Sequence, residues 1–155
     1  MALNTLLPGF AAAVEAGDGR ALAACFTEDG IYHDTFYGEF EGRDAIADML
    51  ENRFWRDAED FRWRFGDVCE AGETGYASWL FGYRSRLEGA AGRRVVVEGM
   101  SRFRLRDGLI ARYDELLDIA VALGQLDFAP ERTARIAARH ARTYRDRAER
   151  EGFWD

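Results

Sequence analysis

The sequence has 155 residues, of which 48% are hydrophobic and 32% are charged, and its formal net charge is −7. This length is typical of one domain, and the hydrophobic content is too high for a disordered chain. No run reaches the roughly 18 apolar residues that a membrane span requires, so no membrane contact is expected. Every basic residue is an arginine, which excludes a Schiff-base lysine and the lysine of a phosphate-binding loop. The acidic balance argues against nucleic acid as a partner.

The scarce residue types exclude further kinds of site. Cys25 and Cys69 form no CxxC pair, and His33 and His140 belong to no zinc or calcium motif, so neither a metal nor another cofactor is expected. No serine lies in a GxSxG motif, which argues against a hydrolase nucleophile. We interpret Cys25 as a small core residue, while a disulfide with Cys69 stays open. The N-terminus lacks the basic residues of a signal peptide, so we expect a cytoplasmic protein.

Helical spacing dominates the N-terminal part of the chain. An apolar stripe predicts a first helix that ends at Gly17, with Asn4 or Thr5 as its cap and Pro8 in its first turn. The stripe comprises Leu3, Leu6, Leu7, Phe10, Ala13 and Val14. A short second helix is expected over residues 19–27, a strand over 31–37 and a third helix over 46–54.

From residue 61 onward the apolar pattern changes to period two, which is typical of half-buried strands. The alternation predicts strands over residues 61–67, 79–84 and 97–105, and a last strand over 109–117. Asp107 and Gly108 indicate a tight hairpin between the last two strands. These elements predict an α+β domain in which a curved antiparallel sheet wraps around three N-terminal helices.

A further helix is expected over residues 130–150, beginning at Pro130. Its small residues form one stripe, which comprises Ala134, Ala137, Ala138, Ala141, Tyr144 and Ala148. Seven arginines occupy the rest of the helix. The simplest interpretation is a solvated helix that packs its alanine stripe on the domain or on a partner subunit. The alternative is a role in binding an anionic ligand.

Three strings, in this order and spacing, resemble the SnoaL-like branch of the nuclear transport factor 2-like superfamily. They are the segments 16–29, 32–46 and 103–118, which contain Ala-Gly-Asp, Tyr-His-Asp and Phe-Arg-Leu-Arg-Asp-Gly in turn. The resemblance covers residues 6–126, so we divide the chain into a SnoaL-like domain over 1–127 and an arginine-rich helical extension over 128–155. It implies a cone-shaped pocket between sheet and helices, and a homodimer.

The resemblance also suggests candidate catalytic residues. Asp34 falls where ketosteroid isomerases carry their general base, and Asp118 where polyketide cyclases and limonene epoxide hydrolase carry a catalytic aspartate. Tyr32 is similar to the tyrosine that positions water in the epoxide hydrolase. Two positions depart from the isomerase pattern. Phe10 stands in place of its oxyanion-hole tyrosine, and Ser101, or Met100 if the hairpin register differs by one residue, stands in place of its protonated aspartic acid. Neither reaction therefore transfers intact.

Six aromatic residues share one strand parity and are either the lining of an apolar pocket or plain core. They are Trp63, Phe65, Trp79, Phe81, Tyr83 and Phe103. With Phe10, Ser101 and Arg112 they form the predicted substrate-binding set. Arg112 either orients Asp118 or only holds its strand.

Each candidate carboxylate also has a structural interpretation. Asp34 either faces the pocket, where burial would raise its pKa, or accepts backbone hydrogen bonds in a turn. Asp118 is either catalytic or the cap of a short helix that follows it. His33 lies on the opposite side of its strand from Asp34 and is expected to be structural. The sharpest hypothesis is that Asp34 and Asp118 converge as base and acid around one ligand.

Three functions remain open on these grounds. The first is an enzyme without metal or other cofactor that performs acid–base chemistry on a small hydrophobic carbonyl or cyclic compound, as an isomerase, cyclase, hydrolase or hydratase. The second is a non-catalytic module that binds a hydrophobic ligand in the same pocket. The third is a structural dimer with a filled core.

Overall fold

The structure is a computed structural model that describes residues 2–154. The helical elements are α1 (Ala2–Ala16), α2 (Gly19–Ala24), α3 (Arg43–Met49), the π-helical η1 (Leu50–Phe54), α4 (Trp55–Asp57), α5 (Ile119–Leu126) and α6 (Pro130–Arg150). The strands are β1 (Phe26–Asp34), β2 (Gly38–Glu41), β3 (Ala58–Ala71), β4 (Thr74–Ser85), β5 (Arg94–Arg106) and β6 (Leu109–Leu117). Within these residues, no helix is long and apolar enough to cross a membrane.

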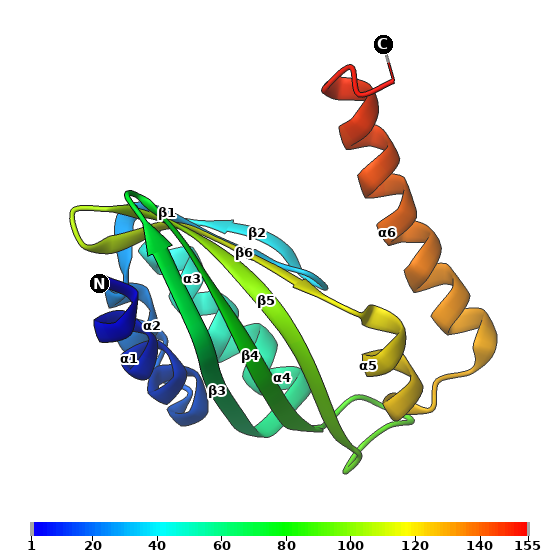
Figure 1. Ribbon diagram of the computed structural model, residues 1–155. Helices are drawn as coiled ribbons and strands as arrows, with labels where there is room; N and C mark the ends of the chain where they lie inside the picture. Colours follow the sequence, from blue (N-terminus) through cyan, green and yellow to red (C-terminus); the bar gives the residue numbers. More distant parts are fainter. Residues whose placement is uncertain (1, 155) are drawn as a thin grey trace.

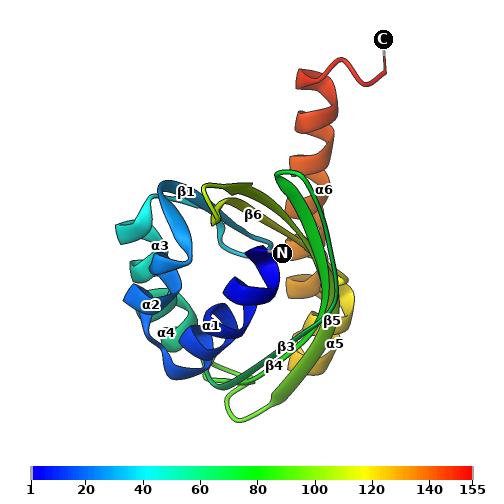
Figure 2. The same cartoon turned by 60° about the vertical axis from the view of Figure 1, so that its left-hand side comes forward.

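The strands form one sheet in the order β2-β1-β6-β5-β4-β3. The sheet bends into a wall that encloses α1, α2 and α3 on its concave side (Figures 1 and 2). The predicted α+β fold with a curved sheet is therefore confirmed. The sheet is mixed rather than fully antiparallel, because β1 and β6, which are distant in sequence, pair in parallel.

The first helix begins earlier than predicted. Main-chain N–H groups of Ala2 and Leu3 donate to the Glu70 carboxylate of β3, at 3.2 and 3.0 Å. This carboxylate from another element satisfies free N–H groups of the first turn, a role that we had given to Asn4 or Thr5. Pro8 consequently lies inside α1 rather than in its first turn.

The first strand also begins earlier than predicted. Helix α2 ends at Ala24, and β1 runs from Phe26 to Asp34 instead of continuing to residue 37. The strand stops because the Asp34 side chain turns the chain. Its Oδ1 accepts hydrogen bonds from the N–H groups of Phe36 and Tyr37, both at 2.8 Å, an arrangement typical of aspartate at turns.

The β5–β6 hairpin turns at Asp107 and Gly108, as predicted, with positive φ angles of 54° and 77°. The register then shifts, because Leu105 pairs with Ile110 whereas Arg104 pairs with Arg112. The extra residue between Ile110 and Arg112 is a β-bulge, which reverses the faces of the following side chains.

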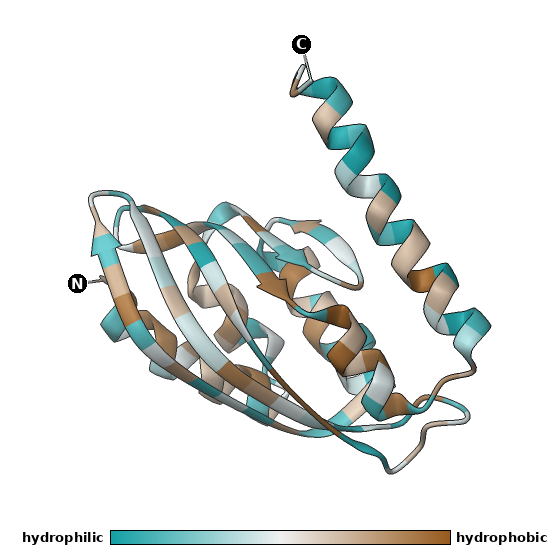
Figure 3. Cartoon of the chain, turned by 45° about the vertical axis from the view of Figure 1, so that its right-hand side comes forward, coloured by the Kyte–Doolittle hydropathy of each residue, from teal (hydrophilic) through white to brown (hydrophobic). Residues whose placement is uncertain are grey.

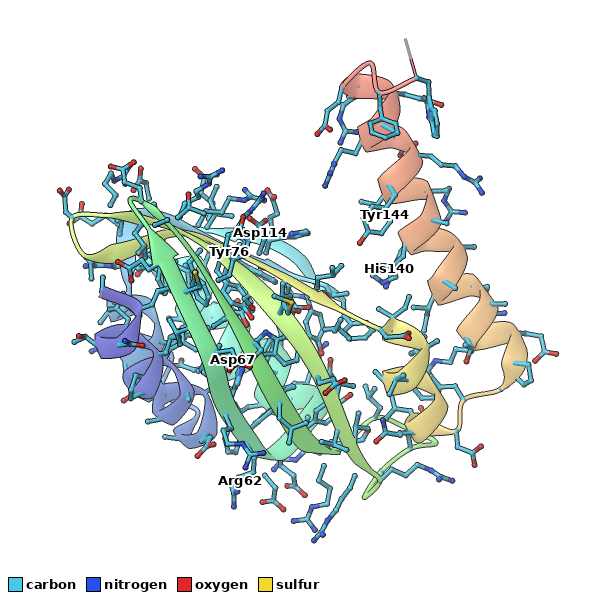
Figure 4. The ribbon with its side chains drawn as sticks, viewed as in Figure 1. Arg62, Asp67, Tyr76, Asp114, His140 and Tyr144 are labelled. Carbon is cyan, nitrogen blue, oxygen red and sulfur yellow. The ribbon has the colours of Figure 1, made fainter. Side chains whose placement is uncertain are left out.

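Helix α6 stands outside the sheet and its enclosed helices (Figure 1). Most of its length is hydrophilic, in contrast to the core elements (Figure 3). It contacts the domain through Ile136, which packs on the core, and through His140, whose ring meets that of Phe36 edge-on at 6.0 Å. Figure 4 shows His140 and Tyr144 on the side of α6 that faces the sheet. The predicted packing of the alanine stripe on the domain is wrong, since four of its alanines, at positions 134, 137, 138 and 141, are exposed. Its packing on a partner subunit stays a prediction.

Candidate active site

A cavity of about 660 Å³ opens between the concave face of the sheet, helix α5 and helix α6. Its wall is mostly apolar and aromatic, and it includes four of the predicted binding residues, Trp63, Trp79, Phe81 and Tyr83. Phe54, Phe61, Val97, Leu117, Leu123 and Leu126 extend the wall. Its size and apolar lining are typical of small-molecule sites.

The Trp79 indole is held in place by two residues of β5. Its Nε1–H donates to the Ser101 hydroxyl at 2.8 Å, and both groups are buried. Gly99 pairs with Trp79 across the strands, and a Cβ atom at Gly99 would lie only 2.5 Å from the indole ring. Ser101 therefore supports the cavity wall from behind and does not line it.

The other predicted binding residues lie elsewhere. Phe10 and Phe103 are fully buried core residues, and Phe65 stacks on Trp63 behind the cavity wall. Placing these three residues and Ser101 in the pocket was wrong, because α1 fills that part of the concave face. Arg112 lies on the outer face, where it pairs with Asp114 at 2.9 Å and also with Glu39.

Asp34 both faces the cavity and accepts backbone hydrogen bonds in a turn, the two roles between which the sequence did not decide. Its side chain lines the cavity and is only 5% exposed. Its Oδ1 accepts the hydrogen bonds of the two turn amides. Neither of these two amides donates to Oδ2. Burial raises the pKa of Asp34 above its ordinary value, against the opposing effect of the hydrogen bonds to the turn.

A second carboxyl group, Glu115 on β6, lines the same cavity. Its Oε1 accepts from the N–H of Thr35 at 2.8 Å, and its Oε2 accepts from the Tyr113 hydroxyl at 2.9 Å. Burial and the negative charge of Asp34 raise the pKa of Glu115 to about 8. Two adjacent carboxyl groups, here the buried Asp34 and the half-buried Glu115, resist losing both protons. We therefore expect the pair to retain one proton at neutral pH.

The Tyr32 side chain is the third polar group of the cavity. It is fully buried, and its hydroxyl has no hydrogen-bond partner among residues 2–154. Its ring packs against that of Tyr113 with the centroids 4.5 Å apart. Burial raises the pKa of Tyr32 well above its ordinary value, so the hydroxyl keeps its proton. A buried hydroxyl without a partner is uncommon in folded proteins.

Asp118 does not join this site. Its side chain is exposed and caps α5, accepting from the N–H of Ala120 at 2.9 Å. It is absent from the cavity wall. The hypothesis that Asp34 and Asp118 converge is therefore wrong, and the group that faces Asp34 is Glu115.

The outer face of the same strand pair carries an ionic network instead of a pocket. His33 points away from Asp34, as predicted, and its Nδ1 lies 3.4 Å from Asp114 Oδ1. Although burial opposes it, hydrogen bonds from His33 and Arg112 hold the pKa of Asp114 well below its ordinary range. Within residues 2–154, no group of three or more His, Cys, Asp or Glu side chains is arranged to hold a metal ion. Cys25 is buried, Cys69 is exposed, and both are free thiols.

Comparisons with known proteins agree with this architecture. The model of the SnoaL-like domain family matches residues 9–113, whereas no curated protein matches the chain significantly. TsrD of Streptomyces laurentii superposes with a TM-score of 0.70 and 24% identity, over 81% of this chain and 95% of its own. A hypothetical protein of Catenulispora acidiphila, which has a ketosteroid isomerase-like fold and was solved with trimethylamine, is also similar. It superposes with a TM-score of 0.70 and 22% identity, over 81% of this chain and 97% of its own. An LEH-like epoxide hydrolase of M. tuberculosis superposes with a TM-score of 0.63 and 17% identity, over 79% of this chain and 86% of its own.

Proposed function

Since this chain belongs to the SnoaL-like domain family, we propose that it is a cofactor-independent enzyme for acid–base chemistry on a small hydrophobic carbonyl or cyclic compound. The observation that carries the proposal is the pair of Asp34 and Glu115 in an apolar cavity. When their surroundings push the pKa values of two neighbouring carboxyl groups apart, the group with the lower pKa can act as the base and the other as the acid.

Asp34 is the base in this proposal. Its turn amides stabilise the ionised form through Oδ1, which leaves Oδ2 to take a proton from the carbon next to a carbonyl. Burial makes the carboxylate more basic than in water, which suits proton abstraction near neutral pH.

Glu115 is the acid. As Asp34 removes the proton from carbon, the electrons of the C–H bond form the C=C bond of the enol. At the same time Glu115 donates its proton to the carbonyl oxygen of the substrate. After this transfer Asp34 is protonated and Glu115 is ionised, so the pair holds one proton before and after the step. Transfer of the proton from Asp34 to a different carbon, together with return of the enol O–H proton to Glu115, gives the isomerised carbonyl compound and restores the starting state of the pair. We infer that the Tyr32 hydroxyl, which lies on the same side of β1 as Asp34, donates a further hydrogen bond to the developing oxyanion.

Related chemistry uses the same two groups. For an epoxide, Glu115 would protonate the ring oxygen while Asp34 activates a water molecule that attacks carbon. The similarity in fold to an epoxide hydrolase supports this range of reactions, and a fold by itself does not select among them.

A proton-exchange assay tests the proposal without knowledge of the natural substrate. β-Tetralone, an enolisable bicyclic ketone, is incubated with the protein in deuterated water, and deuterium uptake next to the carbonyl is followed by NMR. We expect catalysed exchange that Asp34→Asn reduces by about a hundredfold or more. Asp118→Asn is the matched control, since asparagine also caps helices.

The outcomes separate the two functions that the cavity allows. Exchange that is lost in Asp34→Asn and kept in Asp118→Asn supports the enzyme. Binding of β-tetralone without any catalysed exchange contradicts it and favours a non-catalytic hydrophobic binding module.

A further inference from the structure

The cavity has a second chemical feature on the side formed by α6. Four arginines of this helix line the cavity, namely Arg132, Arg135, Arg139 and Arg142. Their spacing of three and four residues places them along one face of the helix. The remaining arginines of α6, Arg145, Arg147 and Arg150, are absent from the cavity wall.

The four cavity arginines are not neutralised within the protein. Among residues 2–154 none of them forms a salt bridge, whereas most arginines around the sheet do, for example Arg84, Arg86 and Arg112. Arg132 instead lies over the Phe128 ring, with its Cζ 3.7 Å from the ring centroid. This contact holds the guanidinium at the cavity wall while its N–H groups stay free.

Other charges around the cavity do not cancel these arginines. Asp57 also lines it but is already paired with Arg56 and with the Tyr37 hydroxyl. Asp34 and Glu115 share one proton and so contribute one negative charge. The positive charge is local, because the whole chain has a net charge of −7.

We propose that the α6 arginines bind the anionic group of an amphiphilic organic acid whose hydrophobic body fills the aromatic cavity. A guanidinium matches a carboxylate or sulfonate with two parallel hydrogen bonds. A ligand that is negatively charged along its whole length is excluded, because its body would meet the aromatic walls and the carboxyl groups of Asp34 and Glu115. The inference deepens the proposed function, since it names the substrate class for the same cavity.

Two fluorescent probes with one ring system separate the contributions of the cavity and the arginines. Anilinonaphthalene sulfonate carries an anionic group, whereas N-phenylnaphthylamine has the same rings without it. Both gain fluorescence in apolar sites, so their affinities are measured by titration. The variant Arg135→Gln/Arg139→Gln removes two cavity arginines, and Arg145→Gln/Arg150→Gln removes two charges from the same helix outside the cavity.

We expect the cavity variant to bind the sulfonate about tenfold more weakly, and the control variant to bind it as the wild type does. Affinity for the neutral probe should stay unchanged in both variants. The proposal is overturned if the cavity variant binds the sulfonate with wild-type affinity, or if both variants lose it equally. It is also overturned if the cavity variant loses both probes together. None of these readouts requires turnover, so the result is independent of whether the carboxyl pair catalyses exchange.

Discussion

Asp34 and Glu115 lie next to each other because β1 and β6 pair in parallel. The register joins Tyr32 with Tyr113 and His33 with Asp114. Asp34 and Glu115 are the next residues along these two strands, and both line the cavity. Successive residues of a strand alternate between faces. One strand pair therefore presents two tyrosines and two carboxyl groups to the concave side, and the His33–Asp114 pair to the outer side.

Replacing Tyr32 by phenylalanine should separate activity from stability. The Tyr32 hydroxyl is buried without a partner, so its removal should leave the free energy of unfolding unchanged or raise it by about 1 kcal/mol. The same change should slow β-tetralone exchange. Urea unfolding and the exchange assay measure the two effects.

Tyr113→Phe is the matched comparison for this prediction. Its hydroxyl donates to Glu115, so its loss should lower the free energy of unfolding by about 1 kcal/mol. Equal destabilisation of the two variants would show that the Tyr32 hydroxyl has a partner after all.

The raised pKa of Glu115 predicts how stability depends on pH. Between the ordinary value of 4.5 and about 8, the folded protein keeps a proton that the unfolded chain releases. The free energy of unfolding should therefore fall as pH rises through this window, by at most about 1.4 kcal/mol per pH unit. Glu115→Gln should flatten the fall, as measured by urea unfolding at several pH values. An unchanged slope in this variant would argue against the raised pKa.

Gly99→Ala should destabilise the wall of the cavity. The added Cβ would lie 2.5 Å from both the Trp79 ring and the Leu116 carbonyl oxygen, so we expect a loss of about 1–3 kcal/mol in thermal or urea unfolding. Gly66→Ala on β3 is the control, because its Cβ would meet nothing closer than the Ser78 hydroxyl at 3.5 Å. Comparable losses in the two variants would contradict the contact between Trp79 and Gly99.

We propose that the outer face of the sheet forms a homodimer. Met100 and Leu116 are cross-strand neighbours there, with 55% and 64% of their surface exposed. Leu116→Arg should convert the protein to a folded monomer of 17.6 kDa in sedimentation equilibrium, since an exposed residue contributes little to the fold itself. Tyr144→Arg on α6 is the control. A dimer that survives Leu116→Arg would place the interface elsewhere.

Much of the architecture could be predicted from the sequence, because periodicity reports which face of an element is buried. The alternation from residue 61 onward identified the strands, and Asp107-Gly108 identified the hairpin. The parallel pairing of β1 with β6 could not be predicted in this way, since periodicity carries no information about which strands are neighbours.

The site was only half predictable, and the bulge after Ile110 explains why. An unbroken hairpin would pair Ser101 with Asp114, whereas the bulge pairs Ser101 with Glu115. The one available signal for Glu115 was its alternation with Tyr113, a large aromatic residue at a buried position. The predicted partner Asp118 was a helix cap, a role that its sequence context fitted equally well.

The state of the carboxyl pair tests the central claim most directly. We expect a carboxyl-carbon NMR titration of the wild-type protein to show a step near pH 8 that both Asp34 and Glu115 report. The Asp34→Asn and Glu115→Gln variants assign the signals. In Asp34→Asn the remaining Glu115 should titrate at lower pH, because burial still raises its pKa but the negative charge of Asp34 no longer does. Separate titration of both groups in the wild type near their ordinary values of about 4 would contradict the account.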